Sequence, residues 1–234
     1  MSYFTWKGKT TDEMHVLVDE YPDIIRPKLR ASYVSVPGSP GYLTQVENDN
    51  AYDSTTRTAI CTLMPEGDIE DVCTWLIGSG SVVFGNEPTY AYKARIDNQI
   101  EFAKILRNTE HRTFAVPFLC QPFKYLATPA ANIEKTVSGQ TITNPGTVSS
   151  APIIKVEGSG DITLSVGGSY VELEGITGGI IIDSDVQDCF TLDRGALLND
   201  KMTGDFPLIL PGTSTVSWTG TVTKITITPN WRWL

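Results

Sequence analysis

The sequence predicts a mainly β protein of two domains, with one helix in the first domain. Three observations carry this prediction: segments that alternate apolar and polar residues, turn residues at regular intervals, and a change of composition near residue 130. Alternation places every second side chain on the same face of a strand, so one face is buried and the other is wet. The chain has 234 residues and is 41% hydrophobic, which suffices for one large or two ordinary packed domains.

The strand pattern is clearest in the second domain, residues 131–234. Segments 161–166 and 223–228 alternate without interruption and place their isoleucine, leucine and valine side chains on one face. Turn residues separate such runs at the spacing of an antiparallel β-sandwich, and paired glycines supply the positive φ angles of hairpins. The expected turns lie at 144–146, 158–160, 167–168, 178–179 and 211–212.

The first domain, residues 1–130, holds most of the charged and aromatic side chains and ends in a junction of small residues with one proline, 127–132. Residues 30–36 predict a strand that ends at Pro37, and residues 113–119 predict another that ends before Pro122. Segment 99–107 fits either a helix or a strand, and we favour a strand. This domain is therefore expected to be a β-barrel or β-sandwich that carries one helix.

The helix is expected over about 68–77. Its apolar residues recur at the spacing of a single helical stripe, and they are Ile69, Val72, Cys73 and Leu76. Asp68 can cap the first turn, and Glu70 and Asp71 suit the positive end of the helix dipole. Gly78 can close the helix at its C-terminal end.

Charge and cysteine content exclude several functions. With 18 basic and 27 acidic residues the formal net charge is −9, which repels phosphate backbones, so no nucleic acid partner is expected. The cysteines have no paired short spacing, and they suit either two disulfides or four buried thiols. We favour free thiols, because two of them lie in apolar segments; the four are Cys61, Cys73, Cys120 and Cys189. With only His15 and His111 to assist them, no zinc site is expected.

Membrane insertion is not expected either. The N-terminal segment has no basic start followed by an apolar run, so it does not predict a signal peptide. The longest apolar stretches, 179–182 and 206–210, are too short to cross a bilayer.

The sequence offers few catalytic candidates. It has no G-x-S-x-G motif, and its two histidines leave little material for a serine triad. We expect His15 to lie in a strand over 14–18 and His111 to lie in a polar surface segment. The Gly-Ser-Gly at 78–80 lacks the Gly-Lys-Ser/Thr ending of a phosphate loop, and we interpret it as a helix C-cap. No catalytic, cofactor or metal residue is assigned, and the protein is not expected to be an enzyme.

Two groups of acidic residues could still supply a metal site or a catalytic pair. Asp183, Asp185 and Asp188 could supply oxygens to a hard cation, but their spacing is not that of an EF-hand, so we favour a solvated loop. Glu172 and Glu174 share one face of a strand, and we interpret them as its wet face rather than as a glycosidase pair. A hydrolase acting on cell wall through these residues is the reading that we favour least.

The late tryptophans keep a sugar-binding function open. Trp218, Trp231 and Trp233 lie late in the second domain, and exposed rings can stack on sugars. Burial in a core or interface is the more ordinary role for such rings. The alternative to be tested is therefore a carbohydrate-binding module for host attachment.

The order of motifs along almost the whole chain resembles the distal tail proteins of long, non-contractile-tailed phages and related prophages. In the first domain the motifs are 4–8, 25–27, 33–43, 75–76, 82–88, 90–94 and 114–123. In the second domain they are 144–146, 150–156, 180–183, 204–208 and 225–233. One position departs from the family, because Ser39-Pro40 stands where relatives often have a charged pair.

The resemblance implies a structural protein of the virion, assembled in the host cytoplasm and located in the tail tip. It implies that the first domain forms a hexameric ring and that the second is a galectin-like β-sandwich that projects outward. It further implies that the ring joins the tail tube protein to a tail-associated fibre or lysin protein and can carry receptor-binding proteins.

Overall fold

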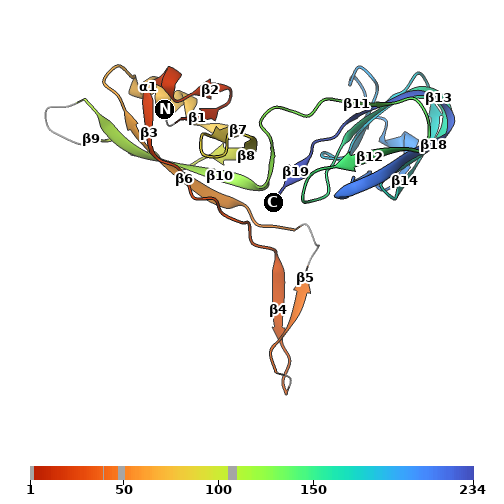
Figure 1. Cartoon of the computed structure of the whole chain (residues 1–234), viewed down its shortest axis with the longest axis horizontal. Helices are drawn as coiled ribbons and strands as arrows, with labels where there is room; N and C mark the ends of the chain where they lie inside the picture. Colours follow the sequence, from red (N-terminus) through yellow and green to blue (C-terminus); the bar gives the residue numbers. More distant parts are fainter. Residues whose placement is uncertain (1–2, 39, 47–50, 105–109) are drawn as a thin grey trace. The chain divides into compact units, whose positions relative to one another are not determined.

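The computed structural model describes residues 3–38, 40–46, 51–104 and 110–234 (Figure 1). The protein is mainly β and, within these residues, has one α-helix, as the sequence predicted. The chain divides into two compact units: the first runs to Ala127 and includes Leu234, and the second spans Thr128–Trp233. In the described part of the chain, no helix is long and apolar enough to cross a membrane.

An antiparallel sheet forms the body of the first unit, with its strands in the order β2-β1-β7-β8-β10-β6-β3 and with β9 paired to β10. Its elements are β1 (Phe4–Trp6), β2 (Lys9–Thr10), the short 3-10 helix η1 (Asp12–Met14), β3 (Val16–Glu20), β6 (Thr55–Leu63), α1 (Ile69–Trp75), β7 (Gly78–Phe84), β8 (Tyr90–Ile96), β9 (Ala103–Lys104) and β10 (Arg112–Leu126). The core is aromatic: the ring of Phe118 lies edge-on to those of Phe4 and Phe84, with centroids 5.3 and 5.4 Å apart. Such edge-on pairs stabilise the core beyond the area that they bury.

Helix α1 confirms the predicted helix but not all of its details. Asp68 caps it, because one carboxylate oxygen accepts hydrogen bonds from the backbone N–H groups of Glu70 and Asp71. Cys73, however, is exposed, because Trp75 shares the buried face with Val72 and leaves Cys73 at the edge of that face. The helix ends at a C-cap on Leu76, so Gly78 opens β7 instead of closing the helix.

Strand β10 is longer than predicted. It continues through Pro122 to Leu126, and its register against β8 shifts between Cys120 and Lys124. Proline cannot donate to a ladder but is tolerated where the pairing is irregular, so Pro122 lies in the bulge and does not end the strand. In the segment 99–107, only Ala103–Lys104 forms a strand, and residues 105–109 lie outside the described residues.

His15 is not part of a strand, contrary to the prediction. It is the C-cap of η1, with a left-handed φ of 53°, and β3 begins at the next residue. The backbone N–H of Met64 donates to the carbonyl of His15 at 2.9 Å, directly before the pairing of β3 with β6 begins. The periodicity of 14–18 was correct for β3 alone.

The second unit is an antiparallel, sandwich-like arrangement with the strand order β11-β18-β13-β14-β17; β12 also pairs with β18, and β15 pairs with β13 and β16. Its elements are β11 (Ile133–Lys135), β12 (Gln140–Asn144), β13 (Ile153–Val166), β14 (Ser169–Ile176), β15 (Ile180–Asp183), β16 (Asp188–Phe190), the 3-10 helix η2 (Asn199–Lys201), β17 (Met202–Gly204) and β18 (Gly212–Thr228), with β19 (Arg232–Trp233) near the end of the chain. The apolar residues of 161–166 and 223–228 are buried as predicted.

The glycine pairs of this unit have two different roles. Gly167 and Gly168, with φ of 60° and 94°, join Val166 to Ser169 in the predicted hairpin. Gly158, in contrast, lies inside β13, where the register against β18 shifts, so the turn predicted at 158–160 is wrong. A Cβ at Gly158 would lie 2.3 Å from the carbonyl oxygen of Thr221. Gly158 therefore allows β13 and β18, the two longest strands of this unit, to approach closely.

Candidate functional site

The most distinctive surface of the first unit is a separate β-hairpin. Its strands are β4 (Ala31–Ser35) and β5 (Tyr42–Val46), and among the described strands they pair only with each other (Figure 1). We call residues 31–46 the arm. The arm contains no charged residue, although 19% of the chain is charged.

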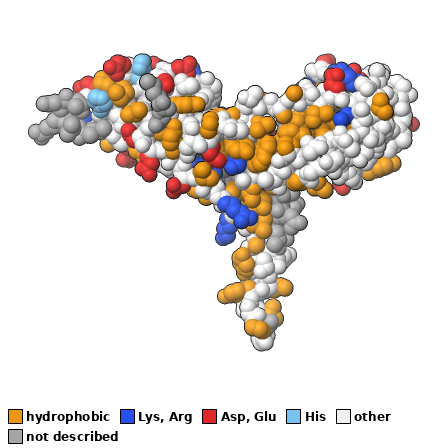
Figure 2. All heavy atoms as spheres, viewed as in Figure 1, with side chains coloured by type: hydrophobic (Ala, Val, Ile, Leu, Met, Phe, Trp, Pro, Cys, Tyr) orange, Lys and Arg blue, Asp and Glu red, His pale blue; other side chains and the backbone are white. Residues whose placement is uncertain are grey.

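The arm exposes apolar side chains on both of its faces. Tyr33 and Tyr42 lie on one face with their ring centroids 6.4 Å apart, and they are 61% and 71% exposed. Val34 and Leu43 are directly paired on the other face and are 48% and 63% exposed. Figure 2 shows hydrophobic side chains along this segment. Exposed apolar surface of this kind commonly marks a site of protein contact.

A short antiparallel stem connects the arm to the sheet. The N–H of Arg30 donates to the carbonyl of Ala51 at 2.8 Å, and the N–H of Asp53 donates to the carbonyl of Lys28 at 2.9 Å. The Arg30 guanidinium also lies 2.8 Å from the Asp53 carboxylate. Beside the stem, the ring of Tyr52 packs edge-on against that of Phe123 on β10. The stem is thus fixed by backbone pairing, one ion pair and one aromatic contact.

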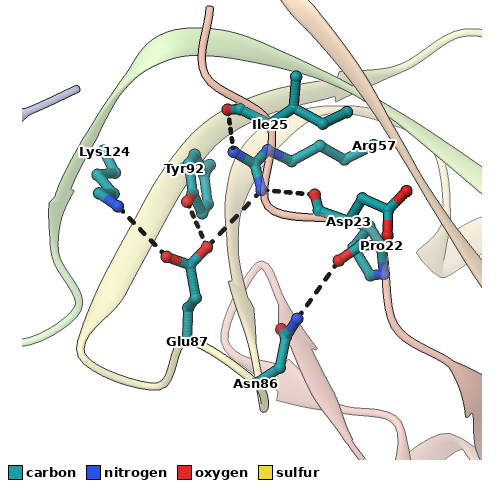
Figure 3. Close-up of polar contacts among 8 residues, drawn as sticks. All are labelled: Pro22, Asp23, Ile25, Arg57, Asn86, Glu87, Tyr92 and Lys124. Atoms are coloured by element: carbon teal, nitrogen blue, oxygen red, sulfur yellow. Dashed lines mark hydrogen bonds and ion pairs between the residues drawn. The ribbon is translucent and has the colours of Figure 1, made fainter.

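A buried polar cluster holds the segment that leads into the stem (Figure 3). Arg57, on β6, is 4% exposed, and its guanidinium donates to the carbonyls of Asp23 at 3.2 Å and Ile25 at 3.1 Å. The side-chain amide of Asn86 donates to the carbonyl of Pro22 at 3.3 Å. Backbone carbonyls that no strand pairs are therefore bound by side chains, which fixes the position of this segment.

Glu87 completes this cluster, which we call the anchor. One of its carboxylate oxygens accepts a 2.6 Å hydrogen bond from the Tyr92 hydroxyl and lies 3.7 Å from the Arg57 guanidinium, while the other lies 3.3 Å from the Lys124 ammonium. The guanidinium also stacks over the Tyr92 ring at 4.3 Å. Burial and the hydrogen bond to Glu87 raise the pKa of Tyr92, so its hydroxyl remains protonated and donates. Each buried charge is paired, as buried charges must be.

Charges of opposite sign gather on two parts of the first unit. Arg26, Lys28 and Arg30 are exposed at the base of the arm, where Figure 2 shows a group of basic side chains. Exposed acids gather along β3, η1 and the segment before α1, and they are Asp12, Glu13, Asp19, Glu20, Glu66 and Asp68. We call β3 together with these acids the acidic edge, because β3 is the last strand of the sheet path in the described residues.

The structure does not assemble a catalytic or metal site from the acidic candidates. Glu172 and Glu174 are exposed on β14 and form its wet face, as predicted. Asp183 is buried, contrary to the expected solvated loop, because it ends the buried strand β15 and pairs with Arg194 at 3.3 Å. Within the described residues, no group of three or more potential ligands could hold a metal ion.

The tryptophans do not form an exposed row. Trp231 is 7% exposed, and Trp218 and Trp233 are half-buried. A sugar-stacking surface needs open rings, so these residues do not support the carbohydrate-binding alternative.

All four cysteines are free, as predicted, but only three are buried. Burial raises the pKa of Cys61 and Cys120 to about 12 and that of Cys189 to about 11. These three thiols are therefore protonated and unreactive at neutral pH. His15 is exposed and His111 is half-buried.

The anchor was missed by sequence reasoning. Arg57 and Glu87 are isolated charges in two otherwise ordinary segments, and no spacing rule brings them together. Of the arm, the sequence predicted only the strand over 30–36, without any sign that a second strand pairs with it apart from the main sheet.

No family model matches the sequence, and no curated protein matches it. The fold, however, is shared with proteins of phage tail adsorption apparatus. The chain is similar to the SPP1 Dit protein, described as a paradigm of the hub adsorption apparatus in phages that infect Gram-positive bacteria, with a TM-score of 0.75 and 15% identity over 100% of both chains.

Two structures of the phage P2 baseplate in its activated conformation are also similar. The structure with calcium has a TM-score of 0.51 at 8% identity and covers 97% of each chain. The structure with strontium has a TM-score of 0.50 at 8% identity and covers 98% of this chain and 99% of the other. At these identities the likeness establishes a Dit-like fold.

Proposed function

We propose that this protein is a non-enzymatic structural component of a phage tail tip, where it serves as a hub of the adsorption apparatus. The observation that carries the proposal is the full-length similarity to the SPP1 Dit protein, which includes both units. Fold alone does not fix function, but two units matched together along one chain are a more specific signature than either sandwich alone.

The proposed assembly is a hexameric ring formed by the first unit, residues 1–130, with the second unit, residues 131–234, available to neighbours. The ring connects the tail tube protein to a tail-associated fibre or lysin protein and provides a rim for receptor-binding proteins. The exposed apolar arm supports a role in contacts between proteins. A net charge of −9 suits a hub through which DNA passes without adhering.

The proposal is tested on phage particles built with this protein. Antibodies raised against the purified chain should label the tail tip in electron micrographs, because a hub lies where the tube ends. Labelling of the head or of the whole tail length, or particles that lack the protein, would overturn the hub assignment. The protein is expected in the virion after assembly in the host cytoplasm.

The ring is tested separately with the purified protein. Light scattering after size exclusion should give a mass near six times 25.6 kDa, and negative-stain images should show six-fold particles. A different closed symmetry would contradict the hexamer while leaving the tail-tip location to the labelling experiment.

A further inference from the structure

We infer that the arm of one copy binds the acidic edge of a second copy of this chain in a head-to-tail contact. The inference rests on the proposed function, because it names the surfaces through which copies of a hub associate. It is carried by three features of the first unit: an unpartnered hairpin, a basic base on that hairpin, and an acidic terminal strand on the main sheet of the same unit.

In the described part of the chain, no strand pairs with the arm and its apolar side chains are exposed. An isolated two-stranded hairpin is at best marginally stable in water and needs a third strand or a packed face. Here Tyr33 and Tyr42 on one face and Val34 and Leu43 on the other remain exposed, and in the described part of the chain no further strand pairs with β4 or β5. Protein that packs on these faces would bury the apolar side chains and complete the hairpin.

Charge identifies the partner. The arm itself is uncharged, and its base presents Arg26 and Lys28, both exposed. A partner should therefore offer an apolar contact bordered by acids. The chain itself has such a surface, since Leu17 is 45% exposed on β3 and the carboxylates of Asp19 and Glu20 follow it. Complementary charges of this kind set the register and the partner choice of an interface.

Strand β3 is also geometrically suited to receive the arm. As the last strand of the described sheet path, it has one side without a strand partner, and such an edge is a template for an added strand. Strands β4 and β5 each have an outer edge of the same kind. Edge pairing supplies main-chain hydrogen bonds, while Leu17 and the arm's apolar residues supply the packing.

The two surfaces are different parts of one chain, so the contact is heterologous. Heterologous contacts generate a closed ring when the rotation between copies closes and an open filament when it does not. The direction of the arm decides between these outcomes. The anchor restricts this direction, because Arg57 and Asn86 bind the carbonyls of Pro22, Asp23 and Ile25 just before the stem.

Charge reversal tests the contact. The arm-reversed variant Arg26→Glu/Lys28→Glu and the edge-reversed variant Glu20→Lys/Glu66→Lys should each weaken self-association by about tenfold or more. Both variants change only exposed side chains, so circular dichroism should show unchanged folding. A mixture of the two should assemble again, because each reversed surface then meets its complement. A matched control, Glu172→Lys/Glu174→Lys on β14, should associate like the wild type.

The apolar contribution is tested in the same way. Tyr42→Ser/Leu43→Ser should abolish assembly, whereas Tyr170→Ser, an exposed tyrosine of the second unit, should not. Mass from light scattering over a range of concentrations and salt is the readout. Rings that survive both the charge-reversed and the arm variants would refute the arm contact and leave the hub proposal intact.

Photo-crosslinking keeps the inference testable if the free protein stays monomeric in size exclusion. Tyr42 is replaced by the photoreactive residue benzoylphenylalanine in an otherwise unchanged chain. Illumination at high protein concentration should crosslink this residue to residues 12–20 or 64–68 of another copy. Crosslinks to other surfaces, or none between copies, overturn the inference. Tail-tip labelling decides the hub proposal independently of that outcome.

Discussion

Trp6 and Trp75 exchange reciprocal hydrogen bonds: the indole N–H of each donates to the backbone carbonyl of the other at 3.0 Å. Both bonds are buried and join β1 to the end of α1. The pair connects the only α-helix of the described residues to the sheet. It also gives an acceptor to two buried indole N–H groups that water does not reach.

Replacing Trp75 by Phe should destabilise the first unit by about 1–3 kcal/mol, because the carbonyl of Trp6 loses its donor in a buried site. Calorimetry of the full chain is the measurement, since two units can unfold in separate transitions. Trp218→Phe, a half-buried position in the second unit, is the control and should leave the transition of the first unit unchanged. An equal loss in both variants would contradict the role of the pair.

Removing Arg57 should be more costly. Arg57→Met leaves the buried carboxylate of Glu87 with fewer partners and frees the carbonyls of Asp23 and Ile25, so we expect a loss of about 3–5 kcal/mol. Urea unfolding gives the free energy, and hydrogen exchange should show faster exchange in the stem, 28–30 and 51–53. Arg95→Met removes an exposed ion pair with Asp97 and should cost less than about 1 kcal/mol. Unchanged exchange in the stem would show that the anchor does not hold the arm.

Stability should decline in alkali because of the buried thiols. The pKa of Cys61 and of Cys120 is raised by burial to about 12 from an ordinary value of 9.0. Because the pKa of each thiol is higher in the folded protein, the unfolded chain loses these protons first as the pH rises. The stabilisation that the protonated thiols give the folded state is therefore complete below pH 9 and is lost as the pH rises toward 12. Each thiol should reduce the free energy of unfolding by about 1.4 kcal/mol per pH unit in that window. Urea titrations at pH 8, 9 and 10 check the slope, and Cys61→Ala should make it shallower.

The native protein should have one thiol that reacts with a disulfide reagent. Cys73 is exposed on α1, while Cys61, Cys120 and Cys189 are buried. Ellman's reagent should therefore label Cys73 in the folded state, more slowly than a free thiol, because partial desolvation and Glu70 raise its pKa. The other three should react only in denaturant, and Cys73→Ser should remove the native reaction.

Substitution of Gly158 should disturb the second unit. A Cβ there would meet the carbonyl oxygen of Thr221 at 2.3 Å, which forces the backbones of β13 and β18 apart. Gly158→Ala should therefore cost about 1–3 kcal/mol and lower the thermal midpoint of that unit. The neighbouring Ser159→Ala, at an exposed position, is the control and should have little effect.

The sequence predicted those elements whose conformation is determined by neighbouring residues. The alternation in 161–166 and 223–228, the Asp68 cap and the paired glycines at 167–168 all express local rules, and the structure confirms each of them. Pairing distant strands requires information that one sequence does not contain. For this reason the turn at 158–160 was wrong: glycines that make a hairpin and glycines that permit a bulge are the same in sequence.

The candidate site was less predictable than the fold. Tyr33 was expected in a strand over 30–36, but no strand was predicted for Leu43, and only the topology shows that β4 and β5 pair apart from the main sheet. The anchor depends on Arg57 binding carbonyls more than 30 residues away in sequence. The burial of Asp183 was not predicted for a similar reason, because its ion-pair partner Arg194 lies beyond the hairpin that follows it.

The state of the cysteines has a consequence for where the protein can persist. Cys61, Cys120 and Cys189 contribute to the fold as small apolar groups, and no covalent link between side chains holds either unit together. Folding therefore requires no oxidant to form a disulfide, and a reductant has no disulfide to break in the folded protein. The packing that holds each unit together should therefore be the same in reducing and in aerated surroundings.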